Sequence, residues 1–165
     1  MLSRFMKRTE GEEGFTLIEL MVVVLIIGIL IAIALPTFLG ARTRAQNRAA
    51  QSDLRNALVA AKTMYTDNSS YAAADSSATG LVTVEPALCY AAAATVSTIG
   101  GACVTGAGAA NISVSAAAAA WAAARISASG TCYGITDTAA GGTKYGIPAT
   151  CNGTTALGVA LTSFP

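Results

Sequence analysis

The sequence predicts an α+β fold in which one long N-terminal helix packs against a small antiparallel β-sheet head. Three observations predict it: an apolar run that continues into an amphipathic stretch, short β-type segments in the last hundred residues, and four cysteines that all follow the helix. The chain of 165 residues divides into four segments, residues 1–14, 15–39, 40–68 and 69–165.

Residues 15–39 form an apolar run of about 25 residues with one charge, Glu19. As a helix this run is about 37 Å long, enough to cross the ~30 Å hydrocarbon core of a bilayer. A charge at mid-membrane depth costs at least ~2.5 kcal/mol, so an acid inside such a segment indicates a functional site. The alternative is that Glu19, only four residues into the run, lies at the membrane interface.

The residues before the run differ from an ordinary export signal. Residues 1–14 carry three basic and three acidic side chains, whereas a secretory signal begins with a positive region. Ala32-Ile33-Ala34 offers a small-x-small site at which the whole run would be removed. The length of the run, the acid within it and the acidic residues upstream argue against that removal.

The string GFTLIE at residues 14–19, followed by MVVVLIIGILIAIALP, resembles the N-terminus of bacterial type IV prepilins and type II secretion pseudopilins. The similarity covers roughly residues 10–65. It implies that residues 1–14 are a leader, cut after Gly14 on the cytoplasmic side by a prepilin peptidase. It also implies that the same enzyme methylates the new amino terminus of Phe15, and that Glu19 is needed for assembly.

The chemistry of a buried ion pair agrees with this resemblance. Cleavage after Gly14 creates a cationic amine on Phe15, and Glu19 of a neighbouring subunit can accept that charge inside an apolar bundle, where an unpaired charge is costly. Gly28 and Pro36 are the helix-weakening residues of the run, and they match positions between which family members often lose helix inside the filament. An ordinary kink in a membrane helix is the alternative for these two residues.

Residues 40–68 are predicted to continue the helix in amphipathic form and to end it within residues 67–70, a cluster of turn formers. Together with the apolar run this makes about 50 residues and roughly 75 Å. The first half therefore needs lipid or other copies of the chain around it, and the second half needs the head. The expected apolar face consists of residues three or four positions apart: Phe38, Ala41, Ala45, Ala49, Leu54, Ala57, Leu58, Ala61, Met64 and Tyr65.

The cysteines Cys89, Cys103, Cys132 and Cys151 predict disulfides and therefore a location outside the cytosol. Three pairings are possible. We favour the sequence-local one, Cys89–Cys103 and Cys132–Cys151, in which each closed loop contributes about 3 kcal/mol.

Residues 69–165 are rich in Ala, Gly, Ser and Thr and predict a sheet of three or four antiparallel strands. The strongest signal is a hairpin of residues 121–129 and 131–137 with a turn at Gly130. The alanine-rich residues 87–95 favour a short helix by intrinsic propensity. Weaker strand candidates are residues 81–85, 112–115 and 144–147, with residues 116–120 leading into the hairpin.

The composition argues against an enzyme. The chain has no histidine, so it has no imidazole-based triad and no His-ligated zinc, and its few acids are too dispersed for a metal site. No phosphate or dinucleotide fingerprint fits. The charge after residue 70 sums to about minus one with no basic patch, which argues against nucleic-acid binding by the head. We expect no cofactor.

The resemblance implies a structural subunit of a type IV pilus, a surface filament used in adhesion, motility or DNA uptake. It implies a single-pass membrane precursor whose partners are other copies of itself, the prepilin peptidase and the inner-membrane assembly machinery. The alternative is a pseudopilin or minor pilin of a type II secretion or competence system. The commonest pseudopilin has an acid-rich calcium loop near its end, whereas this chain has no acid after Asp137.

Overall fold

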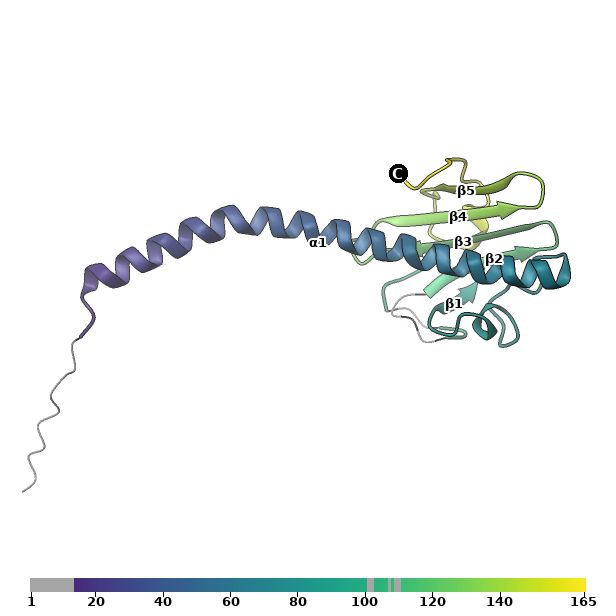
Figure 1. Cartoon of the computed structure of the whole chain (residues 1–165), viewed down its shortest axis with the longest axis horizontal. Helices are drawn as coiled ribbons and strands as arrows, with labels where there is room; N and C mark the ends of the chain where they lie inside the picture. Colours follow the sequence, from purple (N-terminus) through teal and green to yellow (C-terminus); the bar gives the residue numbers. More distant parts are fainter. Residues whose placement is uncertain (1–13, 101–102, 107, 109–110) are drawn as a thin grey trace, which may run out of the picture. The chain divides into compact units, whose positions relative to one another are not determined.

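The structure, a computed structural model, describes residues 14–100, 103–106, 108 and 111–165. It contains two compact units, one ending at Ala41 and a C-terminal unit of Arg42–Pro165. The long helix α1, Leu17–Asn68, contributes to both units. The fold is α+β, as the sequence predicts, and Figure 1 shows its elements.

Helix α1 ends where the turn-forming residues predicted. Ser69 has a φ of 51°, and its N–H donates to the carbonyl of Tyr65 at 2.7 Å. A left-handed residue that closes this bond satisfies one of the carbonyls that every helix end leaves without a partner. Pro36 lies in the interior of α1, and the hydroxyl of the next residue, Thr37, donates to the carbonyl of Ala34 at 2.8 Å.

The apolar side chains of residues 15–39, called here the apolar stem, are exposed. Leu25 is 62% exposed and Phe38 is 67% exposed, and the large apolar side chains of the stem range from 47% exposed at Val22 to 86% exposed at Phe15. By length and composition α1 is long and apolar enough to cross a membrane. The stem therefore has the surface of a segment that lipid or other protein chains must cover.

In the C-terminal unit one face of α1 is buried, but this face begins later than predicted. Ala45 and Ala49 are exposed, and burial begins at Ala50. The reason is the extent of the sheet, since the turn that contains Ser127 reaches only as far along α1 as Asn47. The buried positions of the helix are Ala50, Leu54, Ala57, Leu58, Ala60, Ala61 and Met64.

A five-stranded sheet lies against this face, with the strands in chain order from β1 to β5. The sequence predicted three or four antiparallel strands, but β1 and β2 are parallel and only the other three pairs are antiparallel. Trp121 and Ala123 of β3 belong to the core shared with α1, whereas Ala122 and Ala124 pack on the opposite face with Ala156 of α2. The bounds are β1 Cys89–Ala92, β2 Asn111–Ala117, β3 Ala120–Ile126, β4 Cys132–Thr138, β5 Gly142–Gly146 and α2 Gly153–Ala156.

Two segments differ in type from the sequence prediction. Residues 87–95 were expected to be a short helix, but they contain strand β1, whose Cys89, Tyr90 and Ala91 are fully buried beside β2. Burial and strand pairing outweigh the helix propensity of alanine there. Residues 81–85 were a strand candidate, but Leu81–Thr83 is a single turn of 3-10 helix, η1.

The strongest strand prediction is confirmed. The hairpin of β3 and β4 pairs Ala120 with Thr138 at one end and Ile126 with Cys132 at the other. Gly130 has a φ of 90° in the connecting turn, a conformation that a side chain would strain. The weaker candidates 112–115 and 144–147 correspond to β2 and to most of β5.

Candidate assembly site

The start of α1 brings together Gly14, Phe15 and Glu19, which the sequence marked as the processing and assembly residues. A Cβ at Gly14 would meet no atom within 4 Å, so the described fold gives no packing reason for a glycine at this position. Phe15 is 86% exposed. The rest of the expected leader, residues 1–13, lies outside the described residues.

Glu19 caps the helix that it belongs to. The Thr16 backbone N–H and hydroxyl both donate to Glu19 Oε2, at 2.9 and 2.6 Å, and the Glu19 N–H donates to Thr16 Oγ1 at 3.3 Å. This reciprocal pair is a capping box, which satisfies two of the N–H groups that a helix start leaves without partners. The sequence reasoning missed this role, although the Thr-x-x-Glu spacing is its signature.

The capping box leaves part of the Glu19 carboxylate available. Both hydrogen bonds that the carboxylate accepts go to Oε2, and among the described residues no hydrogen bond to Oε1 and no ion pair to Glu19 is present. A carboxylate has about four lone-pair positions, so the second oxygen can accept a cationic amine without breaking the cap. The geometry is therefore compatible with capping and intermolecular pairing at the same time.

Gly28 and Pro36 lie within the bounds of α1, and the helix runs through both positions. A Cβ at Gly28 would meet no atom within 4 Å. The described chain therefore shows no crowding that requires glycine there. The expectation that this segment loses helix inside a filament concerns an assembled state and stays a prediction.

In the C-terminal unit a buried carboxylate fastens α1 to the sheet. Asp137 of β4 is 4% exposed and pairs with Lys62 Nζ at 3.1 Å. It also accepts hydrogen bonds from Thr143 Oγ1, at 2.5 Å, and from the hydroxyl of Tyr71. Burial on its own would raise the pKa of Asp137, but the hydrogen bonds from Thr143, Tyr71 and Lys62 outweigh it and lower the pKa. Burial and the neighbouring carboxylate raise the pKa of the Tyr71 phenol.

Two further polar contacts fasten the helix nearer to the stem. Arg125 of β3 forms an ion pair with Asp53 of α1, and burial lowers the pKa of Arg125. Asn47 accepts hydrogen bonds from the hydroxyls of Ser127 and Ser129, at 2.8 and 2.5 Å. These contacts join helix to sheet, and their geometry offers no nucleophile beside a base.

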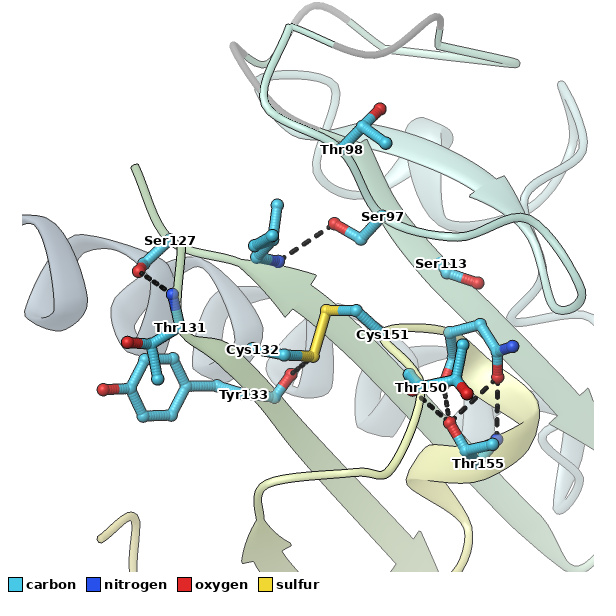
Figure 2. The surroundings of a disulfide bond; sticks show 12 residues. Ser97, Thr98, Ser113, Ser127, Thr131, Cys132, Tyr133, Thr150, Cys151 and Thr155 are labelled. Atoms are coloured by element: carbon cyan, nitrogen blue, oxygen red, sulfur yellow. Dashed lines mark hydrogen bonds between the residues drawn. A yellow bond between two sulfur atoms is a disulfide. The ribbon is translucent and has the colours of Figure 1, made fainter. Parts of the chain in front are cut away.

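The structure contains the two sequence-local disulfides, Cys89–Cys103 and Cys132–Cys151, with Cα atoms 5.2 and 5.6 Å apart. Figure 2 shows that the second bridge lies among serine and threonine side chains. It joins the start of β4 to the segment just before α2, where Asn152 caps the helix by accepting from the Thr155 N–H and the Cys151 carbonyl accepts from the Ser97 N–H. The bridges are cross-links of the fold and leave no free thiol among the described cysteines.

Within residues 14–100, 103–106, 108 and 111–165, no group of three or more His, Cys, Asp or Glu side chains could hold a metal ion. The features with the clearest chemical consequence are therefore the exposed apolar stem and the carboxylate at its start.

Comparison with known proteins also points to the N-terminal segment of the chain. Residues 11–35 match the family described as the prokaryotic N-terminal methylation motif. Over 70 residues the chain is 43% identical to the type IV major pilin protein PilA of Myxococcus xanthus, covering 42% of this chain and 30% of the relative. Over 79 residues it is 43% identical to type II secretion system core protein G of Vibrio cholerae, covering 47% of this chain and 53% of that protein.

A third relative is the type IV wide pilus major component PilA4 of Thermus thermophilus, 42% identical over 59 residues, which cover 36% of this chain and 45% of the relative. The chain thus spans between about a third and a half of the length of these relatives. No solved structure matches the chain. The relatives' names describe structural proteins of filaments and secretion systems and no enzyme.

Proposed function

We propose that this chain is a structural subunit of a type IV pilus. Through its N-terminal segment it belongs to the superfamily of type IV pilins and type II secretion pseudopilins. It polymerises through α1 into a filament on the cell surface. The observation that carries the proposal is the apolar stem, whose large side chains are exposed and whose carboxylate, Glu19, lies four residues from Phe15 within the matched residues 11–35.

The first step is processing. A prepilin peptidase removes residues 1–14 and methylates the amino group of Phe15. The exposed position of Gly14, with open space where a side chain would project, supports the idea that an external protein requires the glycine. The membrane holds the mature chain by its apolar stem until assembly.

The second step is assembly. The stem leaves the lipid only when other stems replace it, because exposing this predominantly apolar run to water is strongly unfavourable. Inside that bundle the Phe15 amine of one subunit needs an anion, and Glu19 Oε1 of a neighbour is available for it. Pairing the two avoids the several kcal/mol that an unpaired buried charge costs, and it sets the register between subunits.

The relatives named type II secretion system core protein G support a second candidate, a pseudopilin. We favour the pilus because the chain has no acidic residue after Asp137, whereas the commonest pseudopilin is expected to have an acid-rich calcium loop near its end. The five-stranded head closed by two disulfides and nearly free of charge suits a filament that packs many identical heads.

The test is the protein content of filaments sheared from the cell surface. A pilus subunit is expected as the main component, with an intact mass that begins at methylated Phe15 and retains both disulfides. Deletion of the gene is expected to remove the filaments. If filaments persist and a secreted enzyme instead accumulates inside the cell, the pseudopilin candidate replaces the pilus. A mature terminus at Thr37 or beyond would contradict both candidates.

A further inference from the structure

Three arginines follow the apolar stem directly. Arg42, Arg44 and Arg48, called here the basic collar, lie three, five and nine residues beyond Leu39 on the same helix. All three are exposed. Arg44 and Arg48 are one helical turn apart and share a flank of α1, whereas Arg42 lies about 200° around the helix from Arg44. The positive charges therefore surround the helix.

The collar has no counter-charge of its own. After Glu19 the next acid in the chain is Asp53, and Asp53 already pairs with Arg125. Like charges one turn apart on a helix repel each other, so Arg44 and Arg48 alone are unfavourable. Among the described residues, no ion pair or hydrogen bond joins a collar arginine to another side chain.

The other basic side chains of the C-terminal unit that lie on or beside α1 are engaged. Arg55 lies over the ring of Phe164, with its guanidinium carbon 5.1 Å from the ring centre. Lys62 pairs with Asp137. This contrast indicates that the collar serves a partner outside the folded unit.

The position of the collar on the helix identifies that partner. The Cα–Cβ bonds of an α-helix tilt toward its N-terminus, so exposed arginines at these positions can extend toward the Leu39 end of the helix. At about 1.5 Å of rise per residue, the collar occupies roughly the first 14 Å of helix beyond Leu39. The headgroup layer and the surface of a bilayer lie within that distance of the hydrocarbon core. Guanidinium groups bind phosphate with paired hydrogen bonds.

We infer that the basic collar binds the phosphate groups of anionic phospholipids at the membrane surface from which the C-terminal unit emerges. The inference rests on the proposed membrane-held precursor. It goes further by naming anionic phospholipids as the lipids that the precursor binds. Basic residues normally favour the cytoplasmic side of a membrane segment, and in the proposed precursor the collar lies on the opposite side. Binding of anionic headgroups compensates for that placement and fixes the depth of the stem before assembly.

The test uses the full mature chain in phosphatidylcholine bilayers that contain spin-labelled phosphatidylglycerol or spin-labelled phosphatidylcholine. The measured quantity is the preference of the protein for the anionic label, from the immobilised fraction of each label. We expect a preference in the wild type that falls in Arg44→Gln, by at most about fivefold for each arginine removed, and that approaches one in the variant with all three arginines changed to Gln. Replacing all three by Lys is expected to retain most of the preference, and 1 M salt to weaken it.

Arg55→Gln is the matched control, because it removes one positive charge from the same helix 16 residues beyond Leu39. It is expected to leave the preference unchanged. Equal preferences in the wild type and the triple Gln variant would overturn the inference, as would an equal loss in Arg44→Gln and Arg55→Gln. A preference that vanishes when each nanodisc holds one copy would identify a second copy as the partner and would also overturn it.

Alkaline carbonate extraction separates this result from the proposed function. If the triple Gln variant remains in the bilayer without lipid preference, the collar inference fails and the membrane-held precursor stands. If the wild-type chain itself is extracted, both fail.

Discussion

Leu25 and Leu54 lie on the same helix, yet Leu25 is 62% exposed and Leu54 is fully buried. Around Leu54, residues of α1 and the sheet form one continuous core, and Asp53, Lys62 and Asn47 add polar contacts to the same sheet. Around Leu25 none of the large apolar side chains among the described residues of the stem is buried. The C-terminal unit thus contains the contacts that stabilise it, whereas the described part of the stem has an exposed apolar surface without such contacts.

The largest expected effect of this contrast is on the stability of the C-terminal unit, and a matched pair of substitutions tests it. Leu54→Ala is expected to destabilise the C-terminal unit by about 2–5 kcal/mol, because it opens a cavity in a packed core. Leu25→Ala removes the same atoms from an exposed site and is expected to leave that stability unchanged. Denaturant unfolding in detergent, followed by the fluorescence of Trp121, the only tryptophan, measures both. Equal losses would mean that the stem contributes to the fold of the C-terminal unit.

The second prediction concerns the disulfides, which cross-link only the C-terminal unit. Replacing Cys132 and Cys151 together by serine is expected to cost about 3 kcal/mol, since the bridge spans 19 residues. Membrane insertion of the stem is expected to be unaffected. Non-reducing peptide mapping checks the pairing first, and a peptide that links Cys103 to Cys132 would refute it.

The third prediction is a pH dependence of the C-terminal unit. Because the folded pKa of Asp137 is lowered from 3.8, its contribution to stability is present above the unfolded pKa and is lost as the pH falls through the folded pKa. Asp137→Asn is expected to lower the stability of the C-terminal unit by about 1–3 kcal/mol near neutral pH. It is also expected to reduce the loss of stability that the wild type shows at acid pH. Urea unfolding between pH 2 and pH 7 measures it. If the variant loses as much stability at acid pH as the wild type does, the pH dependence comes from other carboxylates.

The sequence predicted best those features that local chemistry determines. The end of α1 in a cluster of turn formers, the β3–β4 hairpin around Gly130 and the sequence-local disulfides all agree with the structure. Features that depend on distant contacts were missed. Strand β1 was read as helix because its alanines favour helix until β2 pairs with them, and the parallel pairing joins segments about twenty residues apart.

The sequence marked part of the candidate site, whose roles in processing and assembly stay predictions. The positions of Gly14, Phe15 and Glu19 follow from a local motif, and the comparisons match the same segment. The role of Asp137 could not be read from the sequence, because Tyr71 and Lys62 lie more than sixty residues away along the chain and meet it only after folding. The capping box of Thr16 and Glu19 has a local signature, the Thr-x-x-Glu spacing, and was therefore predictable from the sequence.

The smallest structural effect expected is that of Thr16→Ala. It removes the hydroxyl of the capping box, which costs about 1 kcal/mol at the helix start, and it leaves the charge of Glu19 in place. The stability of the C-terminal unit and the yield of filaments are expected to remain near the wild-type values. Filament counts by electron microscopy check the yield. A loss of filaments in this variant would mean that assembly depends on the cap.

The most direct test of the account is Glu19→Gln as the only copy of the subunit. Glutamine serves in the same capping box, so this variant preserves the helix start and removes only the charge. We expect the mature, methylated subunit to remain in the membrane with a stable C-terminal unit, while the yield of surface filaments falls about a hundredfold or more, because the Phe15 amine is buried without a partner. Wild-type filament yield from Glu19→Gln would contradict the central claim that the exposed stem assembles through the charge of Glu19.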